Sequence, residues 1–285
     1  MEYKKSMIIL IILTVFLFGI ADACASDVDD AAVACEDSMS IESMQNNNFN
    51  ADEILTDNPK TFTQLDSDIN ESQDTFEVKY DYTFYNQSDD GPVVIDKSDF
   101  TINGNNHVLD GNRQSGIFFI TGNNVTISNL VFINGNSFWG GAIYASGLVT
   151  LNNVTFIANN ANRGGAIYSN GQMTLDNATF IDNNASCGGA IAYFNNILNC
   201  INSRFTGNNA GYGGAIYSNG QVTLDNATFI SNNAGSGGAI LYSGNMLNCI
   251  NSRFIDNSAE EGSSITLDNA LLNVCTSFFT SNRPN

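Results

Sequence analysis

Proline is scarce in this 285-residue chain, which has three, and none lies between Pro92 and Pro284. Such a stretch suits interior strands, because every N–H group of an interior strand is needed for the backbone ladder. Positive charge is also scarce: ten Lys and Arg stand against 29 Asp and Glu, which gives a formal net charge of −19. This balance argues against a nucleic-acid partner, which needs a basic face, and provides no polybasic attraction to anionic membranes.

Histidine and cysteine are also few. His107 is the single histidine and lies in an Asn-rich turn, with no Cys or second His at ligand spacing. We therefore interpret it as structural and expect no metal and no cofactor. Removal of a leader that contains Cys24 would leave an odd set of five cysteines, which does not fit a disulfide scaffold.

Of the remaining cysteines, Cys200 and Cys249 fall in a repeat position held elsewhere by Leu. We expect both to be buried thiols, and too far apart for a disulfide, because the coil of Leu224 lies between them. We expect Cys187 in a loop before Gly188 and Cys275 facing outward; Cys35 falls in the N-terminal tether described below.

A tandem repeat dominates the sequence. Its first motif, Gly-Gly-Ala-Ile, begins at Gly140, Gly164, Gly188, Gly213 and Gly237. Its second motif, Phe-x-x-Asn, pairs Phe156, Phe180, Phe205, Phe229 and Phe254 with Asn159, Asn183, Asn208, Asn232 and Asn257. The segment that starts at Gly164 recurs almost unchanged from Gly213, which indicates duplication of a block of two units.

The spacing within each unit predicts strands. In Val149-Thr-Leu151 and Val154-Thr-Phe156 every second residue is apolar, which is typical of a strand with one buried face. The Gly- and Asn-rich pairs between these runs favour turns. Three short strands and three turns in 24 or 25 residues make one coil, so we predict an all-β fold: a right-handed parallel β-helix of about 24–25 residues per coil. The recurring Phe should form an internal stack, and the recurring Asn side chains should bond to one another and to backbone.

Four regions follow from the pattern. Residues 1–25 combine Lys4 and Lys5, an apolar run and an Ala-x-Ala site, which predicts a secretory signal peptide; an uncleaved N-terminal anchor is the alternative. Residues 26–60 form an acidic, disordered tether. Residues 61–92 form an N-terminal cap, and residues 93–285 the parallel β-helix, with regular repeats over 140–282.

The cap is predicted from two patterns. Phe62, Leu65 and Ile69 mark one face of a short helix. Alternation of apolar and polar residues over 76–84 then predicts a half-buried strand, and together the two should cover the open edge of the first coil. Short, irregular strands are expected at 93–95, 100–102, 108–110, 117–120 and 125–127.

Carboxylates are candidate catalytic residues, because β-helices also carry polysaccharide lyases and hydrolases. Asp176 and Asp225 hold equivalent positions but should stand two coils apart, with Ile201 between them, so we interpret them as solvated turn residues. Asp182 and Asp256 alternate with Ala, Gly and Ser in their turn. Arg163, Arg204 and Arg253 are expected to be exposed charges, and no catalytic residue is assigned.

Asn-x-Ser/Thr sequons provide candidate glycosylation sites on an exported chain. They lie at Asn70, Asn86, Asn124, Asn153, Asn177, Asn184 and Asn226.

The paired motifs also carry a family resemblance. Gly-Gly-Ala-Ile with Phe-x-x-Asn resembles the repeat of the chlamydial polymorphic outer-membrane proteins. The segments FTINGNNHVLDG (100–111) and GNNVTISNLVFING (122–135) resemble adhesin-like, Asn/Thr-rich surface proteins of methanogenic archaea. The resemblance covers residues 61–285 and implies a pectin-lyase-like β-helix displayed outside the cell, in adhesion. The larger members carry C-terminal immunoglobulin-like or anchoring modules, and we expect none among residues 61–285.

These observations predict a secreted or cell-surface, adhesin-like protein without catalysis, which presents a β-helix surface to cell-surface glycans or proteins. The mature chain should bind no nucleic acid and have no membrane span. One alternative is a carbohydrate-active β-helix enzyme or its degenerate relative. A second is a structural envelope component without a specific ligand.

Overall fold

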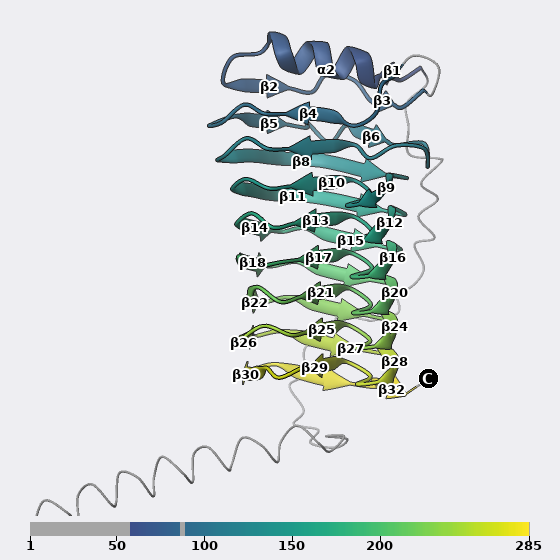
Figure 1. Cartoon of the computed structure of the whole chain (residues 1–285), viewed down its shortest axis with the longest axis vertical. Coiled ribbons are helices and arrows are strands. Elements are labelled where there is room, and N and C mark those ends of the chain that lie inside the picture. The colour runs from purple at the N-terminus through teal and green to yellow at the C-terminus, as the bar shows by residue number, and fades with distance from the viewer. Residues whose placement is uncertain (1–57, 86–88, 285) are drawn as a thin grey trace, which may run out of the picture. The chain divides into compact units, whose positions relative to one another are not determined.

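The computed structural model of the protein describes residues 58–85 and 89–284. The predicted signal peptide, residues 26–57 of the predicted tether, Cys35 and Asn86 lie outside the described residues. The described chain is a right-handed parallel β-solenoid of about nine turns, with one short helix near its N-terminal end. Figure 1 shows the coils stacked from blue to yellow, with the helix α2 across the first of them. The predicted fold class is confirmed.

Three parallel sheets run along the stack. The eight-stranded sheet contains β4 (Val93–Ile95), β7 (Phe118–Ile120), β10 (Ile143–Ala145), β13 (Ile167–Ser169), β17 (Ile191–Tyr193), β21 (Ile216–Ser218), β25 (Ile240–Tyr242) and β29 (Ile265–Leu267). The seven-stranded sheet contains β9 (Asn136–Trp139), β12 (Asn160–Arg163), β16 (Asn184–Cys187), β20 (Asn209–Tyr212), β24 (Asn233–Ser236), β28 (Ser258–Glu261) and β32 (Arg283–Pro284).

The third sheet, here called the long sheet, has 17 strands. They are β1 (Lys60–Thr61), β2 (Thr75–Glu77), β3 (Tyr82–Thr83), β5 (Thr101–Asn103), β6 (Val108–Asp110), β8 (Val125–Ile133), β11 (Val149–Ile157), β14 (Met173–Asp176), β15 (Thr179–Ile181), β18 (Ile197–Ile201), β19 (Arg204–Thr206), β22 (Gln221–Asp225), β23 (Thr228–Ile230), β26 (Met246–Ile250), β27 (Arg253–Ile255), β30 (Leu271–Cys275) and β31 (Phe278–Thr280). The irregular strands predicted between residues 93 and 127 are confirmed to within a residue or two, except that β8 runs on to Ile133.

The long sheet is bent, which corrects the prediction of three strands per coil. In a regular coil such as that of β14 and β15, two segments of this sheet flank Asn177, whose φ is +55°. Asn153, Asn202, Asn226 and Asn251 have the same left-handed backbone at this corner, a conformation that Asn tolerates better than most residues. Each such coil therefore has four strand segments on three sheets. The apolar period does not change across the bend, so the sequence did not indicate it.

The Gly-Gly pair serves two different needs at the corner before the eight-stranded sheet. Gly164 has a φ of +67°, in the left-handed region that favours glycine. Gly165 has no such φ, but a Cβ there would lie 2.0 Å from the carbonyl oxygen of Gly189 in the next coil. The first glycine therefore permits the turn, and the second permits the coils to approach each other.

The recurring phenylalanines stack inside the solenoid, as the repeat predicts. Neighbouring rings from Phe132 to Phe279 are nearly parallel, with centroids 4.6–4.9 Å apart. Their strands pair in register, so that Phe205 faces Phe180 on one side and Phe229 on the other. Phe205 is fully buried, and its ring is part of a continuous apolar core.

The recurring asparagines form a second internal column, here called the inner amide ladder: Asn159, Asn183, Asn208, Asn232, Asn257 and Asn282. The Asn208 Oδ1 atom accepts from both the backbone N–H (3.1 Å) and the Nδ2 (3.0 Å) of Asn183. Its Nδ2 donates to the Asn232 Oδ1 (2.9 Å) and the Phe180 carbonyl oxygen (3.2 Å). This uses the full bonding capacity of the carboxamide, which a buried polar group requires.

Tyrosine and serine alternate in one core column, which explains the two-unit block. Ser169, Tyr193, Ser218 and Tyr242 are successive partners across the eight-stranded sheet, and all are buried. Tyr193 has Ser169 and Ser218 as its two neighbours, and Tyr242 has Ser218 on one side and Leu267 on the other, so the two tyrosines are never adjacent in the column. The Tyr193 hydroxyl donates to the Gly171 carbonyl oxygen at 2.7 Å, and that of Tyr242 to the Met246 carbonyl oxygen at 2.8 Å.

The predicted cap helix is confirmed as α2 (Phe62–Glu71), with Phe62, Leu65 and Ile69 buried. Thr61 and Gln64 form a capping box at its N-terminus. At its C-terminus the Lys97 ammonium donates to the carbonyl oxygens of Ile69 (2.7 Å) and Asn70 (3.1 Å), and the Ile69 oxygen also accepts from the Ser72 N–H (3.1 Å). Lys97 thereby ties the C-terminal end of the helix to the solenoid.

The predicted single cap strand over 76–84 is wrong. The chain forms two short strands, β2 and β3, which pair separately with β5 and β6. Tyr80, which the alternation places inside, is 49% exposed, with the Lys60 Nζ 3.8 Å from its ring centroid. The segment bends between the two strands because it follows the two segments of the long sheet beneath it. It is therefore part of the first coil as well as part of the cap.

Replacement of Phe205 by Ala should lower the free energy of unfolding by about 3–5 kcal/mol, because it leaves a cavity in a stacked column. Chemical denaturation monitored by circular dichroism measures this loss. Tyr212→Ala is the control, because that ring is 55% exposed and its removal should change stability by less than about 0.5 kcal/mol. An unchanged midpoint for the Phe205 variant would contradict an internal stack.

Asn208 and Asn209 are adjacent residues that offer a matched test of the inner amide ladder. Asn208→Ala deprives two buried donors of Asn183 of their acceptor, at about 1–3 kcal/mol each. Asn209→Ala removes only exposed amide contacts, to Asn184 and Asn233, and should cost less than about 1 kcal/mol. Equal losses for the two variants in urea denaturation would show that burial of the ladder does not matter.

Asp89 makes the stability of the cap depend on pH. Its carboxylate accepts from the Thr63 N–H and Oγ1 and from the Tyr85 N–H, each at 2.7 Å. Burial alone would raise the pKa of Asp89, but these hydrogen bonds outweigh it and hold the pKa below its usual value. A depressed folded pKa gives stability that is present above the unfolded pKa of about 3.9 and lost as pH falls through the folded value.

Asp89→Asn should therefore destabilise the protein at pH 7 and have progressively less effect below about pH 4. Thermal unfolding of the two proteins across pH 2–7 measures the difference. A difference in midpoint that stays constant over this range would exclude the carboxylate as its source.

Candidate functional site

The most regular residues of the repeat are structural and face inward. The glycines of Gly-Gly-Ala-Ile form the close turns, and the phenylalanines and asparagines of Phe-x-x-Asn fill the interior. All five motif phenylalanines, from Phe156 to Phe254, and all five motif asparagines, from Asn159 to Asn257, are fully buried. A ligand therefore has to contact the residues between these motifs, on the outer faces and corners of the coils.

The carboxylates weighed as catalytic candidates do not converge. Asp176 pairs with Ile201, and Ile201 with Asp225, so the two acids stand two coils apart, as predicted. Each accepts a hydrogen bond from an asparagine of the next coil, Asn202 Nδ2 at 3.0 Å and Asn251 Nδ2 at 3.3 Å.

The other charged candidates are also dispersed. Asp182 and Asp256 occupy a left-handed turn position, with φ of +52° and +53°. Burial raises the pKa of Asp182. Thr228 separates Arg204 from Arg253 in the register, and Arg163 is exposed beside Phe194, 6.0 Å from its ring centroid.

His107 has a structural partner. Its Nδ1 lies 2.9 Å from the Asp81 Oδ1, an atom that also accepts from the Val108 N–H at 2.9 Å. Asp81 is 3% exposed, so the pair fixes the first coil against the cap. No group of three or more His, Cys, Asp or Glu that could hold a metal ion occurs among residues 58–85 and 89–284.

The cysteines follow the prediction with one correction. Cys200 and Cys249 are buried on either side of Leu224. Burial raises the pKa of both thiols, to about 12 for Cys249. Cys275 is exposed. Cys187 lies at the end of strand β16 and not in a loop, because the seven-stranded sheet extends to the residue before the left-handed glycine.

The described sequon asparagines are all exposed, and their Nδ2 groups already donate hydrogen bonds. Asn70 donates to Asp66 and Asn124 to Asp99. The other four donate to asparagines of the preceding coil: Asn153 to Asn129, Asn177 to Asn153, Asn184 to Asn160 and Asn226 to Asn202. An Nδ2 that carries a glycan keeps one N–H, so modification at these positions stays a prediction compatible with the geometry.

A band of outward aromatic side chains is the feature that sequence analysis missed. We call it the aromatic strip: Phe119, Phe138, Trp139, Tyr144, Tyr168, Phe194 and Tyr217, joined by ring contacts of 4.8–6.1 Å. It follows the outer face of the eight-stranded sheet and reaches the end of β9. The signal was present in Gly-Gly-Ala-Ile-Tyr, because the residue after an inward Ile in a strand must point outward.

The rings of the strip are not equally available. Phe119, Tyr144 and Tyr168 stack on one another, so they present ring edges to solvent. Phe138 and Trp139 meet edge to face and are 62% and 48% exposed. These two rings border a hollow of about 120 Å³ that Pro92 and Phe119 also line. Exposed aromatic surface gathered beside a hollow is typical of interaction sites.

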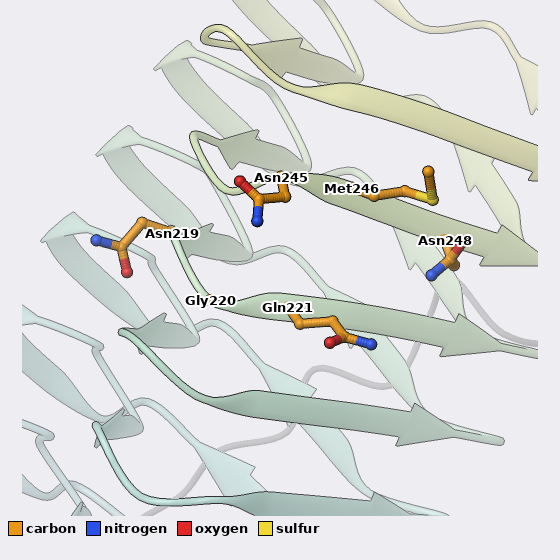
Figure 2. Close-up of a pocket in the computed structure, with 6 residues that line it drawn as sticks. All are labelled: Asn219, Gly220, Gln221, Asn245, Met246 and Asn248. Atoms are coloured by element: carbon orange, nitrogen blue, oxygen red, sulfur yellow. The ribbon is translucent and has the colours of Figure 1, made fainter.

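A second hollow lies where the eight-stranded sheet meets the long sheet. We call it the amide groove; it has a volume of about 330 Å³ and is lined by Asn219, Gly220, Gln221, Asn245, Met246 and Asn248. Figure 2 shows that the first three come from one coil and the other three from the next, with the Gln221 and Met246 side chains projecting from neighbouring strands. Tyr217, the last ring of the aromatic strip, lies two residues before Asn219.

The chain belongs to the right-handed β-helix family, whose model matches residues 69–229, more than half of its length. A search of curated proteins finds no match to the sequence. Among solved structures the chain is similar to L. reuteri 53608 SRRP, at 14% identity and a TM-score of 0.48, over 78% of this chain and 98% of that one. No helix in the described part of the chain is long and apolar enough to cross a membrane.

Proposed function

We propose that this protein is an exported, adhesin-like β-helix that binds glycans through the aromatic strip and performs no catalysis. The observation that carries the proposal is the exposure of Phe138 and Trp139, 62% and 48%, beside a hollow on a solenoid whose interior is already packed. Neither ring is needed to fill the core, and exposed aromatic rings gathered beside a hollow usually serve an interaction.

A sugar ring fits this surface better than a folded protein partner does. The hollow is small and shallow, about 120 Å³, and suits a single ring more than a broad interface. The apolar face of a pyranose can pack against the indole of Trp139, while its hydroxyl groups remain in water or reach the tyrosine hydroxyls of the strip. The charge of −19 disfavours an acidic polymer as the ligand.

The carboxylates support the absence of catalysis in this proposal, because Asp176 and Asp225 have Ile201 between them and each accepts a hydrogen bond from an asparagine of the next coil. Export to the cell surface is supported by the leader-like residues 1–25. Kinship with methanogen adhesins and with the chlamydial repeat proteins remains part of the proposal, on the motifs quoted above.

Removal of the two exposed rings should weaken glycan retention without unfolding the protein. Phe138→Ala combined with Trp139→Ala should weaken retention on a glycan array at least tenfold and leave the unfolding midpoint nearly unchanged. Tyr212→Ala is the matched control, an exposed ring in the same register column but outside the strip. Retention of no glycan by the unmodified protein would favour a structural role, and turnover of pectin or uronate polymers would establish an enzyme.

A further inference from the structure

The amide groove has the size and the chemistry of a ligand subsite. Its volume of about 330 Å³ lies at the lower end of the range for small-molecule pockets. All of its polar side chains are carboxamides, which carry both donors and acceptors, and its one apolar side chain is Met246, 42% exposed. No charged side chain lines it.

Most of the bonding capacity of these amides is unused within the described chain. Asn219 Oδ1 accepts from the Asn195 N–H at 3.0 Å, and Asn248 Oδ1 from the Asn273 Nδ2 at 3.1 Å, which leaves both Nδ2 groups as donors. The side chains of Gln221 and Asn245 are exposed and make no hydrogen bond to any other described residue. These amides are thus available to a ligand, in contrast to the inner amide ladder.

The groove is part of the folded architecture. A Cβ at Gly220 would lie 2.6 Å from the Asn196 carbonyl oxygen and 2.9 Å from the buried ring of Tyr193, so the floor of the groove must be backbone. Tyr242 holds the opposite wall through its hydrogen bond to the Met246 carbonyl oxygen. The alternation of Tyr and Ser in the core therefore fixes the shape of this corner.

We propose that the amide groove is the specificity-determining subsite of the glycan site, and that it selects neutral sugars over uronic acids. Vicinal hydroxyls of a neutral sugar both donate and accept, which suits paired carboxamides, and the C–H face of the ring packs on Met246. A carboxylate finds no cation in the groove, because no charged side chain lines it. Tyr217, the last ring of the aromatic strip, lies two residues before Asn219 of the groove. This inference rests on the proposed function.

Isothermal titration with neutral hexose and N-acetylhexosamine oligosaccharides, and with oligogalacturonate, tests the assignment. The unmodified protein should bind members of the neutral set more tightly than oligogalacturonate. Gln221→Ala combined with Asn245→Ala should weaken neutral binding about tenfold, because it removes hydrogen bonds of both side chains. Gln114→Ala, an exposed glutamine of the same chemistry far from the groove, should bind as the unmodified protein does.

The outcomes separate the two proposals. Three results would overturn the groove assignment and leave the aromatic strip as the glycan site. The groove variant could bind neutral sugars as tightly as the unmodified protein, or the Gln114 variant could lose as much affinity as the groove variant. The unmodified protein could also prefer oligogalacturonate to the neutral sugars. Loss of all binding in the Phe138/Trp139 variant would support the aromatic strip as the glycan site, whether or not the groove assignment holds. An unmodified protein that binds neither class would overturn both proposals.

Discussion

Buried carboxamides join each regular coil of this solenoid to the next. A column of asparagines in the interior is tolerated only if every lone pair and every N–H finds a partner, because an unpaired buried polar group is costly. Asn183 and Asn208 show how this is met: the oxygen of one coil accepts two donors of the coil before it, and the amide nitrogen bonds both neighbours. A slip of one residue would break every bond in the column. The ladder therefore reinforces, with directional hydrogen bonds, the register that burial of the phenylalanine stack also requires.

That register also determines which residues of each coil face the solvent. Once the interior column positions are fixed, residues that alternate with them point outward and can vary without loss of fold. The aromatic strip and the amide groove both use such positions. The groove also depends on the core beneath it, since Tyr193 and Tyr242 shape the corner that Gly220 and Met246 form. The alternation of Tyr and Ser within each block of two units therefore affects both the packing of the core and the shape of the surface. The two units of a block present different corners to solvent.

Much of this arrangement could be predicted from the sequence, and the failures have physical causes. The motif period predicted the coils, because in-register stacking returns identical residues to identical positions, as Phe180, Phe205 and Phe229 show. The bend at Asn177 was missed because a single left-handed residue does not disturb the apolar alternation around it. The cap segment around Tyr80 was assigned as one strand because a bend leaves the same alternation. The aromatic strip was not predicted because its rings, such as Tyr144, occupy outward positions that the apolar alternation does not constrain. The amide groove was not predicted because it joins Gln221 to Asn245 across two coils.

The exchange of side-chain amide protons tests the central role of the inner amide ladder most directly. In NMR hydrogen exchange, the Nδ2 protons of Asn183, Asn208 and Asn232 should be protected nearly to the level of global unfolding, because each is buried and doubly bonded. Those of the adjacent, exposed Asn184, Asn209 and Asn233 should exchange rapidly. Equal and rapid exchange in both sets would contradict the account, since it would mean that the column does not hold the coils in register.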